Sequence, residues 1–453
     1  MFPYPPAQPP FCNGLLVALP VSEPGNKVPA VSDGPKMANG FNNLGASDKS
    51  AHVLLEEAPL PECKTLHTQS AGPNGTRPHV LFIIDELCEM GGAERVLLKT
   101  VRLLPRELFR CSVLTFKANL QAEEVRNIAC PLYVMPLKKT YDWNALKVAR
   151  QIRRFIKEHK VSIVQTFHET SDLWAGPIAK LSGCPVLISS RRDLGILRSR
   201  KHRIGYKVMA RLYDTVLAVS PQVKQFCLEQ DGLDDGKVQT LFSGMEMERV
   251  EKATDRSIMR KRLNIAEDVP VITTVGNIRK VKGIDVLIKA ADLVCRRHSR
   301  ALFLVVGRKS EAEYCQELEN KLSSLCLTAN FRFLGSREDV FSLLRMSDVF
   351  CLPSRSEGFS NALIEAMGSR LPCVVTDVGG NSEVLKHGET GFLVANEDWQ
   401  DMAARLIYLL DDPGLAAEMG LCGEEVIQSR FTTDVMIGEL VKVYQRLLKE
   451  RRA

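Results

Sequence analysis

Two glutamates, eight residues apart, follow an apolar segment and flank a glycine turn. Glu357 follows the apolar run 349–352 and precedes Gly358, and Glu365 falls in the next helical pattern. The pattern predicts a strand, a turn and a helix. The residues expected at the turn and the helix start are Phe359, Ser360 and Asn361. Helix N-termini bind phosphates and carboxylates accept bonds from sugar hydroxyls, so this segment predicts a phosphosugar site. The alternative is a pair of surface glutamates without a ligand.

A basic pair and a glycine pair stand in two further loops between an apolar run and a helical pattern. Arg279 and Lys282 follow a run that ends at Gly276, and they suit the two charges of a diphosphate. Gly91 and Gly92 open a helix after the run 79–84, where glycine lets the backbone approach a ligand closely. A solvated basic loop and a tight turn without ligands are the alternatives.

Short apolar runs alternate with amphipathic helical patterns from residue 79 onward. The expected strands are residues 79–84, 111–116, 132–135, 163–166, 186–189, 216–219, 238–242, 271–276, 302–306, 331–334, 349–352, 373–376 and 392–394. The expected core-facing helical stripes are Leu97, Val101 and Leu104; Leu146, Ala149 and Ile152; and Ile284, Leu287, Ile288 and Ala291. Continuous apolar strands separated by helices indicate parallel sheets covered on both faces. The sequence therefore predicts an α/β protein of two doubly wound, Rossmann-like domains around a central cleft.

The domain organisation follows from shifts in composition. Residues 1–76 hold about half of the 23 prolines and no arginine, so we expect a tail without a packed core. We expect an N-terminal domain over 77–250 and a C-terminal domain over 251–430. The polar stretch 248–265 is the predicted linker, and residues 431–453 are expected to form a helix that packs back across the domains.

Composition excludes several classes of function. The chain has 453 residues, 45% of them hydrophobic, and a net charge of +6. This mild excess suits anionic substrates or an anionic membrane surface and is too weak to indicate nucleic acid. The thirteen cysteines contain no C-x-x-C pair, which favours reduced thiols and a cytoplasmic location. No apolar run reaches about 18 residues, so we expect no spanning helix.

The spacing of Glu357 and Glu365 is that of the E-x(7)-E motif, and E-G-F-S-N-A-L-I-E-A-M resembles glycosyltransferase family 4. The segments G-G-A-E-R, V-G-N-I-R-K-V-K-G and T-D-V-G-G-N-S-E-V are similar to runs of the same family, in family order. The resemblance covers residues 79 to about 447 and implies the GT-B fold, with the N-terminal domain on the acceptor side and the C-terminal domain holding the nucleotide sugar. It implies that Glu357 contacts the donor sugar and Glu365 the ribose. It also implies that Arg279, Lys282 and the amides around Phe359 hold the diphosphate.

This resemblance implies transfer of a sugar from a nucleotide diphosphate to a glycan or lipid-linked acceptor, with retention of anomeric configuration. No D-x-D triplet occurs, so we expect neither a metal nor a cofactor. Many relatives carry a histidine where this chain has Arg191 and Arg192, while His168 stands at the preceding strand end. We take these three as acceptor-side candidates. A non-catalytic nucleotide-sugar-binding protein and a GT-B epimerase or phosphorylase are the alternatives.

A basic, partly apolar stretch over residues 197–212 predicts a helix that could lie on an anionic membrane surface. The alternative is a solvated helix whose apolar stripe packs on the N-terminal domain.

Overall fold

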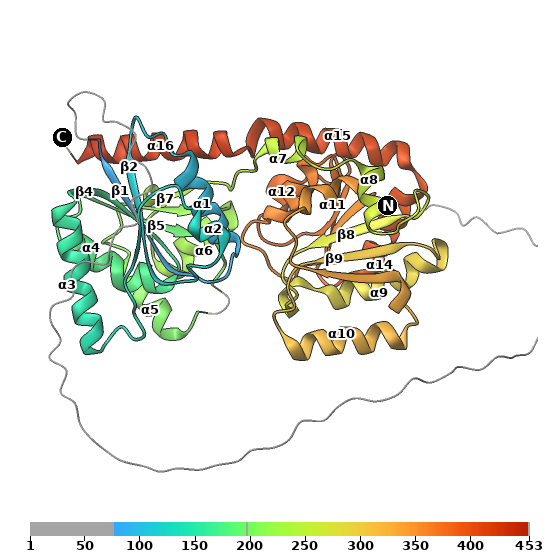
Figure 1. The fold of residues 1–453 in the computed structure, drawn as a ribbon, viewed down its shortest axis with the longest axis horizontal. Coiled ribbons are helices and arrows are strands. Elements are labelled where there is room, and N and C mark those ends of the chain that lie inside the picture. Colours follow the sequence, from blue (N-terminus) through green and yellow to red (C-terminus); the bar gives the residue numbers. More distant parts are fainter. Residues whose placement is uncertain (1–76, 196–197, 452–453) are drawn as a thin grey trace, which may run out of the picture. The chain divides into compact units, whose positions relative to one another are not determined.

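The computed structural model describes residues 77–195 and 198–451. The expectations for residues 1–76, and for Leu197 at the start of the basic stretch, lie outside the described residues. The described residues form one seven-stranded and one six-stranded sheet, and helices cover both faces of each (Figure 1). The predicted α/β fold with two Rossmann-like domains is confirmed.

The first sheet is parallel throughout and has the order β3-β2-β1-β4-β5-β6-β7. Its strands are β1 (His79–Leu87), β2 (Arg110–Ala118), β3 (Leu132–Val134), β4 (Val161–Phe167), β5 (Val186–Arg191), β6 (Thr215–Ala218) and β7 (Val238–Thr240). Its helices are α1 (Gly92–Leu103), α2 (Glu123–Arg126), α3 (Trp143–Glu158), α4 (Gly176–Leu181), α5 (Arg200–Met209) and α6 (Pro221–Asp231). The direction of strand addition reverses between β1 and β4, where such sheets bind ligands.

The second sheet is also parallel and has the order β10-β9-β8-β11-β12-β13. Its strands are β8 (Val271–Val275), β9 (Leu302–Val306), β10 (Phe331–Gly335), β11 (Val349–Leu352), β12 (Cys373–Thr376) and β13 (Gly391–Val394). Its helices are α9 (Ile284–Arg297), α10 (Ala312–Ser324), α11 (Val340–Met346), α12 (Asn361–Gly368), α13 (Asn381–Val384) and α14 (Trp399–Asp411). Strand addition reverses here between β8 and β11.

The strands form where apolar residues continue without alternation. Five consecutive residues of β1, from Val80 to Ile84, are fully buried, and β9 is buried along its whole length. Burial on both faces requires such runs, because helices cover each side of a parallel sheet. Every strand expected from the sequence is confirmed, with ends that shift by a few residues.

Two of the three predicted helical stripes are confirmed and one is wrong. The stripes of α1 and α9 are buried as expected. In α3, Leu146 is 48% exposed, and the core-facing residues are Ala145, Val148 and Ile152. Steps of three alone drift around a helix of 3.6 residues per turn, whereas alternating steps of three and four stay on one face.

The predicted linker over 248–265 is folded. It contains α7 (Met247–Glu251) and α8 (Arg256–Arg262). Arg260 is fully buried, and its guanidinium donates to four backbone carbonyls at 2.9–3.1 Å and to Asp348 at 2.8 Å. The polar stretch stands between β7 and β8 in the chain and is packed through this arginine.

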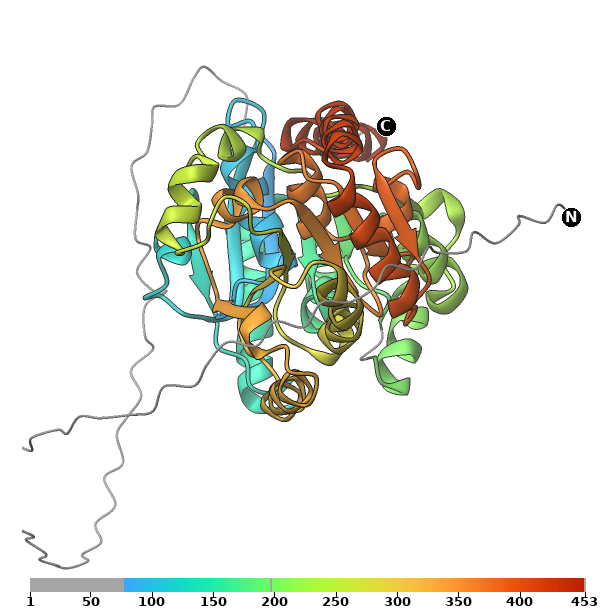
Figure 2. The same cartoon turned by 90° about the vertical axis from the view of Figure 1, so that its right-hand side faces the viewer.

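The last two helices, α15 (Pro413–Arg430) and α16 (Thr433–Glu450), close the chain, and Figure 2 looks almost along their axes. Residues of α16 belong to the core of the first sheet. The Tyr444 ring packs edge-on against Phe109 with centroids 5.5 Å apart, and its hydroxyl donates to Gln165. Within the described ranges, we find no helix with the length and apolar character needed to span a membrane.

Candidate functional site

Three loops at the carboxyl ends of strands carry most of the residues singled out from the sequence. The first joins β1 to α1, the second β8 to α9, and the third β11 to α12. β1 and β4 flank the strand-order reversal of the first sheet, and β8 and β11 flank that of the second. Ligands of open α/β sheets bind at such reversals.

Glu357 and Lys282 form an ion pair between the second and third loops. Lys282 Nζ donates to Glu357 Oε1 at 2.6 Å, and the Ser354 hydroxyl donates to the same oxygen at 2.7 Å. The Glu357 side chain is 9% exposed and that of Lys282 is 26% exposed. Glu357 Oε2 accepts no hydrogen bond from the described residues, so this oxygen remains available to a ligand hydroxyl.

Arg279 lies on the same loop as Lys282 and is exposed. Its guanidinium forms neither a hydrogen bond nor an ion pair with any described residue. The two cations expected to act together thus differ: Lys282 is held by Glu357, whereas Arg279 is free to meet a ligand.

The second and third loops pack closely because Gly283 lies between them. Its φ is +65°, and a Cβ built there would stand 2.0 Å from the Pro353 carbonyl oxygen. Any other residue would therefore both strain the backbone and separate the loops. Gly283 is also the N-cap of α9. This one position therefore fixes both where the helix begins and where Lys282 lies relative to the third loop.

Arg355 ties these two loops together, and no pattern in the sequence indicated it. Its guanidinium binds both carboxylate oxygens of Asp285 at 2.8 and 2.9 Å, the Lys280 carbonyl at 2.6 Å, and Glu397 at 2.5 Å. The Tyr314 hydroxyl donates to Asp285 at 2.5 Å. Burial alone would raise the pKa of Asp285, but the bonds from Arg355 and Tyr314 outweigh it and lower that pKa to about 2.

Helix α12 begins at the third loop as predicted. The Ser360 hydroxyl caps it by accepting from the Leu363 amide at 3.2 Å. Phe359 is 8% exposed, and its ring packs against the rings of Phe242 and Phe431, with centroids 5.6 and 5.8 Å away. The aromatic ring anchors the turn, so the backbone amides at the start of α12 are held in place.

Glu365 of α12 is close enough to α1 for the positive charges of that helix to act on its carboxylate. Burial raises the pKa of Glu365, and the charges of Lys99 and Arg95 on α1 oppose this rise. The starts of the two helices also meet, because a Cβ on Gly92 would stand 3.4 Å from Asn361 Nδ2. The glycine pair of the first loop is thus next to the third loop.

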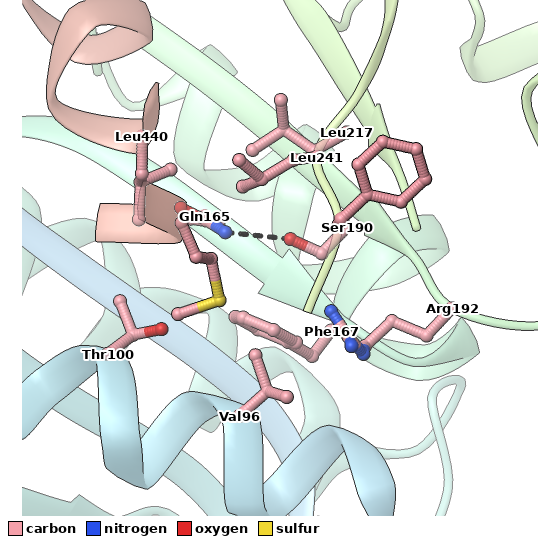
Figure 3. A pocket seen from close by; sticks show the side chains of 11 residues that line it. Val96, Thr100, Gln165, Phe167, Ser190, Arg192, Leu217, Leu241 and Leu440 are labelled. Carbon is pink, nitrogen blue, oxygen red and sulfur yellow. Dashed lines mark hydrogen bonds between the residues drawn. The ribbon is translucent and has the colours of Figure 1, made fainter. Parts of the chain in front are cut away.

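The segment after β5 also reaches the third loop. A Cβ on Gly358 would lie 2.2 Å from the Arg192 carbonyl oxygen, so the turn requires glycine for this approach. Arg192 itself projects beside Phe167 into a cavity at the ends of the central strands (Figure 3).

The three acceptor-side candidates lie in different environments. His168 directly follows β4 and has a φ of +70°, and its Nε2 stands 3.6 Å from Glu94 Oε1. Arg191 is 2% exposed, and its Nη1 donates to Asp172 at 2.7 Å. Successive strand residues face opposite sides, so Arg191 enters the domain interior whereas Arg192 lies beside the third loop.

Two family models match the chain in sequence order. The model described as Glycosyltransferase Family 4 matches residues 90–249, and the one described as Glycosyl transferases group 1 matches residues 255–425. The three loops fall within these matches, apart from the residues of the first loop before Met90.

Several known proteins are similar to this chain. N-acetyl-alpha-D-glucosaminyl L-malate synthase of Bacillus anthracis is 31% identical over 214 residues, which cover 47% of this chain and 55% of that protein. UDP-Gal:alpha-D-GlcNAc-diphosphoundecaprenol alpha-1,3-galactosyltransferase of Escherichia coli is 23% identical over 349 residues, covering 75% of this chain and 89% of that protein. The solved structure of Anabaena Alr3699/HepE in complex with UDP superposes with a TM-score of 0.73 at 20% identity, over 81% of this chain and 99% of that one. With both family models matched and the GT-B architecture in place, the chain belongs to glycosyltransferase family 4.

Proposed function

We propose that this protein transfers a sugar from a nucleotide diphosphate donor to an acceptor that is a glycan or a lipid-linked glycan. The observation that carries the proposal is the group formed by Lys282, Glu357 and the capped start of α12, with the unpaired Arg279 on the adjoining loop. Cations and helix N–H groups suit a diphosphate, and a nearby carboxylate suits sugar hydroxyls.

In the proposed reaction, the bond between the anomeric carbon and the β-phosphate oxygen breaks, and its electron pair leaves with the nucleoside diphosphate. A bond from the acceptor oxygen to the anomeric carbon forms, and the acceptor proton passes to the leaving phosphate. Arg279, Lys282 and the amides at the start of α12 stabilise the charge that develops on this phosphate. By the family resemblance, we propose that configuration is retained and that no metal takes part.

The two glutamates have separate roles in this proposal. Glu357 accepts hydrogen bonds from the donor sugar through Oε2, and through Oε1 once Lys282 turns to the phosphate. Glu365 accepts from the ribose hydroxyls. Burial raises the pKa of Glu365, and the positive charges of Lys99 and Arg95 on α1 oppose this rise.

A thermal-shift screen with nucleoside diphosphates and their sugars tests the binding step. A ligand at about 100 times its Kd raises the free energy of unfolding by about 2.7 kcal/mol, so a true donor should give a clear rise in Tm. Turnover of that donor separates an enzyme from a non-catalytic binding protein. No shift with any nucleotide would contradict the proposal.

We also propose that the protein works in the cytoplasm and touches an anionic membrane surface through α5. Ile204 and Val208 on this helix are 64% and 63% exposed. Leu212 of the same stripe packs against the core, so the exposed part of the stripe is Ile204 and Val208. Arg200 and Lys201 on the same helix would meet anionic headgroups. Co-sedimentation with anionic but not neutral vesicles, lost at high salt and in Ile204→Ser, is the expected result, and no binding at low salt would contradict it.

A further inference from the structure

Two cysteines lie opposite each other where β2 and β3 begin. Cys111 is the second residue of β2, and Cys130 stands two residues before β3. Paired residues of these parallel strands are 19 positions apart, as are Val113 and Leu132. The Val113 amide also donates to the Pro131 carbonyl at 2.9 Å, which extends the ladder toward the cysteines. The same offset of 19 positions joins Cys111 to Cys130.

Both thiols are on the same face of the sheet. Alternate strand residues share a face, so Cys111 is on the side of Val113 and Cys130 on the side of Leu132. All four residues belong to one apolar cluster, and both cysteines are free thiols. Neighbouring strands lie about 4.8 Å apart, and disulfides join Cα atoms that are about 4.4–6.8 Å apart. The register therefore suits a disulfide between them.

The cysteines Cys351 and Cys373 provide an internal contrast. They lie on the neighbouring strands β11 and β12, but Cys351 pairs with Val374 and Cys373 with Phe350. Because they are out of register by one residue, they face opposite sides of the sheet and belong to different apolar clusters. Burial raises the pKa of both thiols. This pair is suited neither to ionisation nor to a disulfide.

Cys111 is activated by its two polar neighbours. The Arg106 guanidinium donates to Cys111 Sγ and, at 2.7 Å, to the Ala129 carbonyl next to Cys130. The hydrogen bond from Cys130 and the charge of Arg106 lower the pKa of Cys111, although burial opposes them. The same hydrogen bond raises the pKa of Cys130, because it holds the proton of that thiol. Cys111 thus has the thiolate character that oxidation requires, with a protonated thiol beside it.

The pair is reached from the edge of the first sheet, where β3 is the outermost strand. Cys130 is half-buried between the exposed Ala129 and Pro131, whereas Cys111 is 6% exposed. Such access suits a small oxidant better than a protein partner.

From the register of the two cysteines and the contact of Arg106 with Cys111, we infer that Cys111 and Cys130 are a redox-active pair that a hydroperoxide converts to a reversible disulfide. The Cys111 thiolate attacks one oxygen of hydrogen peroxide, the O–O bond breaks, and hydroxide leaves with the electron pair. Cys111 is then a sulfenic acid. The Cys130 sulfur attacks Cys111 Sγ, the S–O bond breaks, and the departing hydroxyl takes the Cys130 proton to form water.

The two thiols together lose two electrons in this sequence. The peroxide becomes two water molecules, once the hydroxide takes up the proton that Cys111 released on ionisation. The disulfide would join β2 to the segment before β3, away from the three loops. The inference does not depend on the proposed sugar transfer.

Peptide mapping of the full chain by mass spectrometry, after treatment with hydrogen peroxide and alkylation of the remaining thiols, tests the inference. We expect a cross-linked peptide that contains Cys111 and Cys130, lighter by two hydrogens than the two free peptides and lost after dithiothreitol. Cys351 and Cys373 should remain unlinked under the same conditions. Absence of the Cys111–Cys130 cross-link at peroxide concentrations that oxidise a free cysteine would overturn the inference.

Variants assign the roles within the pair. Cys130→Ser should trap the sulfenic acid on Cys111, detected with a dimedone label, and Cys111→Ser should leave Cys130 unlabelled. Arg106→Gln should slow cross-linking at least about fivefold, because the thiolate fraction of Cys111 falls. Arg110→Gln is the matched control, since it removes the exposed charge next to Cys111 in sequence and should cross-link like the wild type. Label on Cys130 alone, or equal slowing by both arginine variants, would contradict the activation of Cys111.

Discussion

Glu357→Gln should bind a nucleoside diphosphate more tightly than the wild type, although it should transfer sugar far more slowly. In the structure Lys282 is not free, because its ammonium group is 2.6 Å from Glu357 Oε1. A diphosphate must draw Lys282 away from this carboxylate and also bind near its negative charge. The glutamine removes both costs while it keeps the size of the side chain and an oxygen for the Ser354 hydroxyl.

The magnitude follows from the exposure of the pair. An exposed ion pair contributes about 0.2–1 kcal/mol, and drawing one partner away from a buried pair costs more, because it leaves an uncompensated charge. Glu357 is 9% exposed and Lys282 is 26% exposed. We therefore expect a gain of about 1 kcal/mol, or roughly five- to tenfold in Kd. The sugar-bearing donor should not gain, because the amide introduced by Glu357→Gln is a weaker acceptor for its hydroxyls than the carboxylate.

Isothermal titration with the nucleoside diphosphate and with its sugar conjugate measures both effects. Glu424→Gln is the control, since Glu424 is 12% exposed and pairs with Arg370 at 2.7 Å on α15. It loses the same charge outside the three loops and should bind like the wild type. Unchanged or weaker binding of the nucleoside diphosphate by Glu357→Gln would refute the role given to the ion pair, as would normal turnover.

Three further predictions concern the cations, the loop network and metals. Arg279→Ala should weaken nucleoside diphosphate binding by about 1.5–3 kcal/mol, while the nucleoside binds as before; equal losses for both would indicate misfolding. The Arg355–Asp285 contact should stabilise the protein by about 2 kcal/mol above pH 4 and lose this contribution as the pH falls through about 2, because the folded pKa of Asp285 is lowered from 3.8 to about 2. Denaturant unfolding of wild type and Asp285→Asn should therefore converge at low pH, and a constant difference would contradict the assignment. Sugar transfer should survive dialysis against EDTA, and loss of activity restored by Mg²⁺ or Mn²⁺ would show that a metal takes part.

Much of the fold was predictable because burial on both faces of a parallel sheet demands unbroken apolar runs. The strand 349–352 and the helix from Asn361 are examples, since the run, the glycine turn and the cap stand together in the sequence. The α3 stripe was missed because Leu146 is apolar and yet exposed. Local periodicity cannot show which of two adjacent faces meets the sheet.

The site was predictable only in part, because its partners are distant in sequence. Glu357 and Lys282 were expected in one site, but their direct ion pair joins residues 75 positions apart. The sequence does not indicate that Arg355 joins two loops, since its partner Asp285 lies 70 residues earlier. Arg191 and Arg192 are adjacent residues of the same type in the sequence, yet Arg191 pairs with buried carboxylates and Arg192 does not.

The central claim is that Lys282 and Glu357 form part of a sugar-transfer site. Release of nucleoside diphosphate from a panel of UDP-, GDP-, ADP- and dTDP-sugars, with wild type and Lys282→Ala side by side, tests it most directly. We predict release from at least one donor by the wild type, and a rate at least about 100-fold lower in the variant, which is roughly 2.7 kcal/mol of transition-state stabilisation. No release from any donor, or equal release by both proteins, would contradict it.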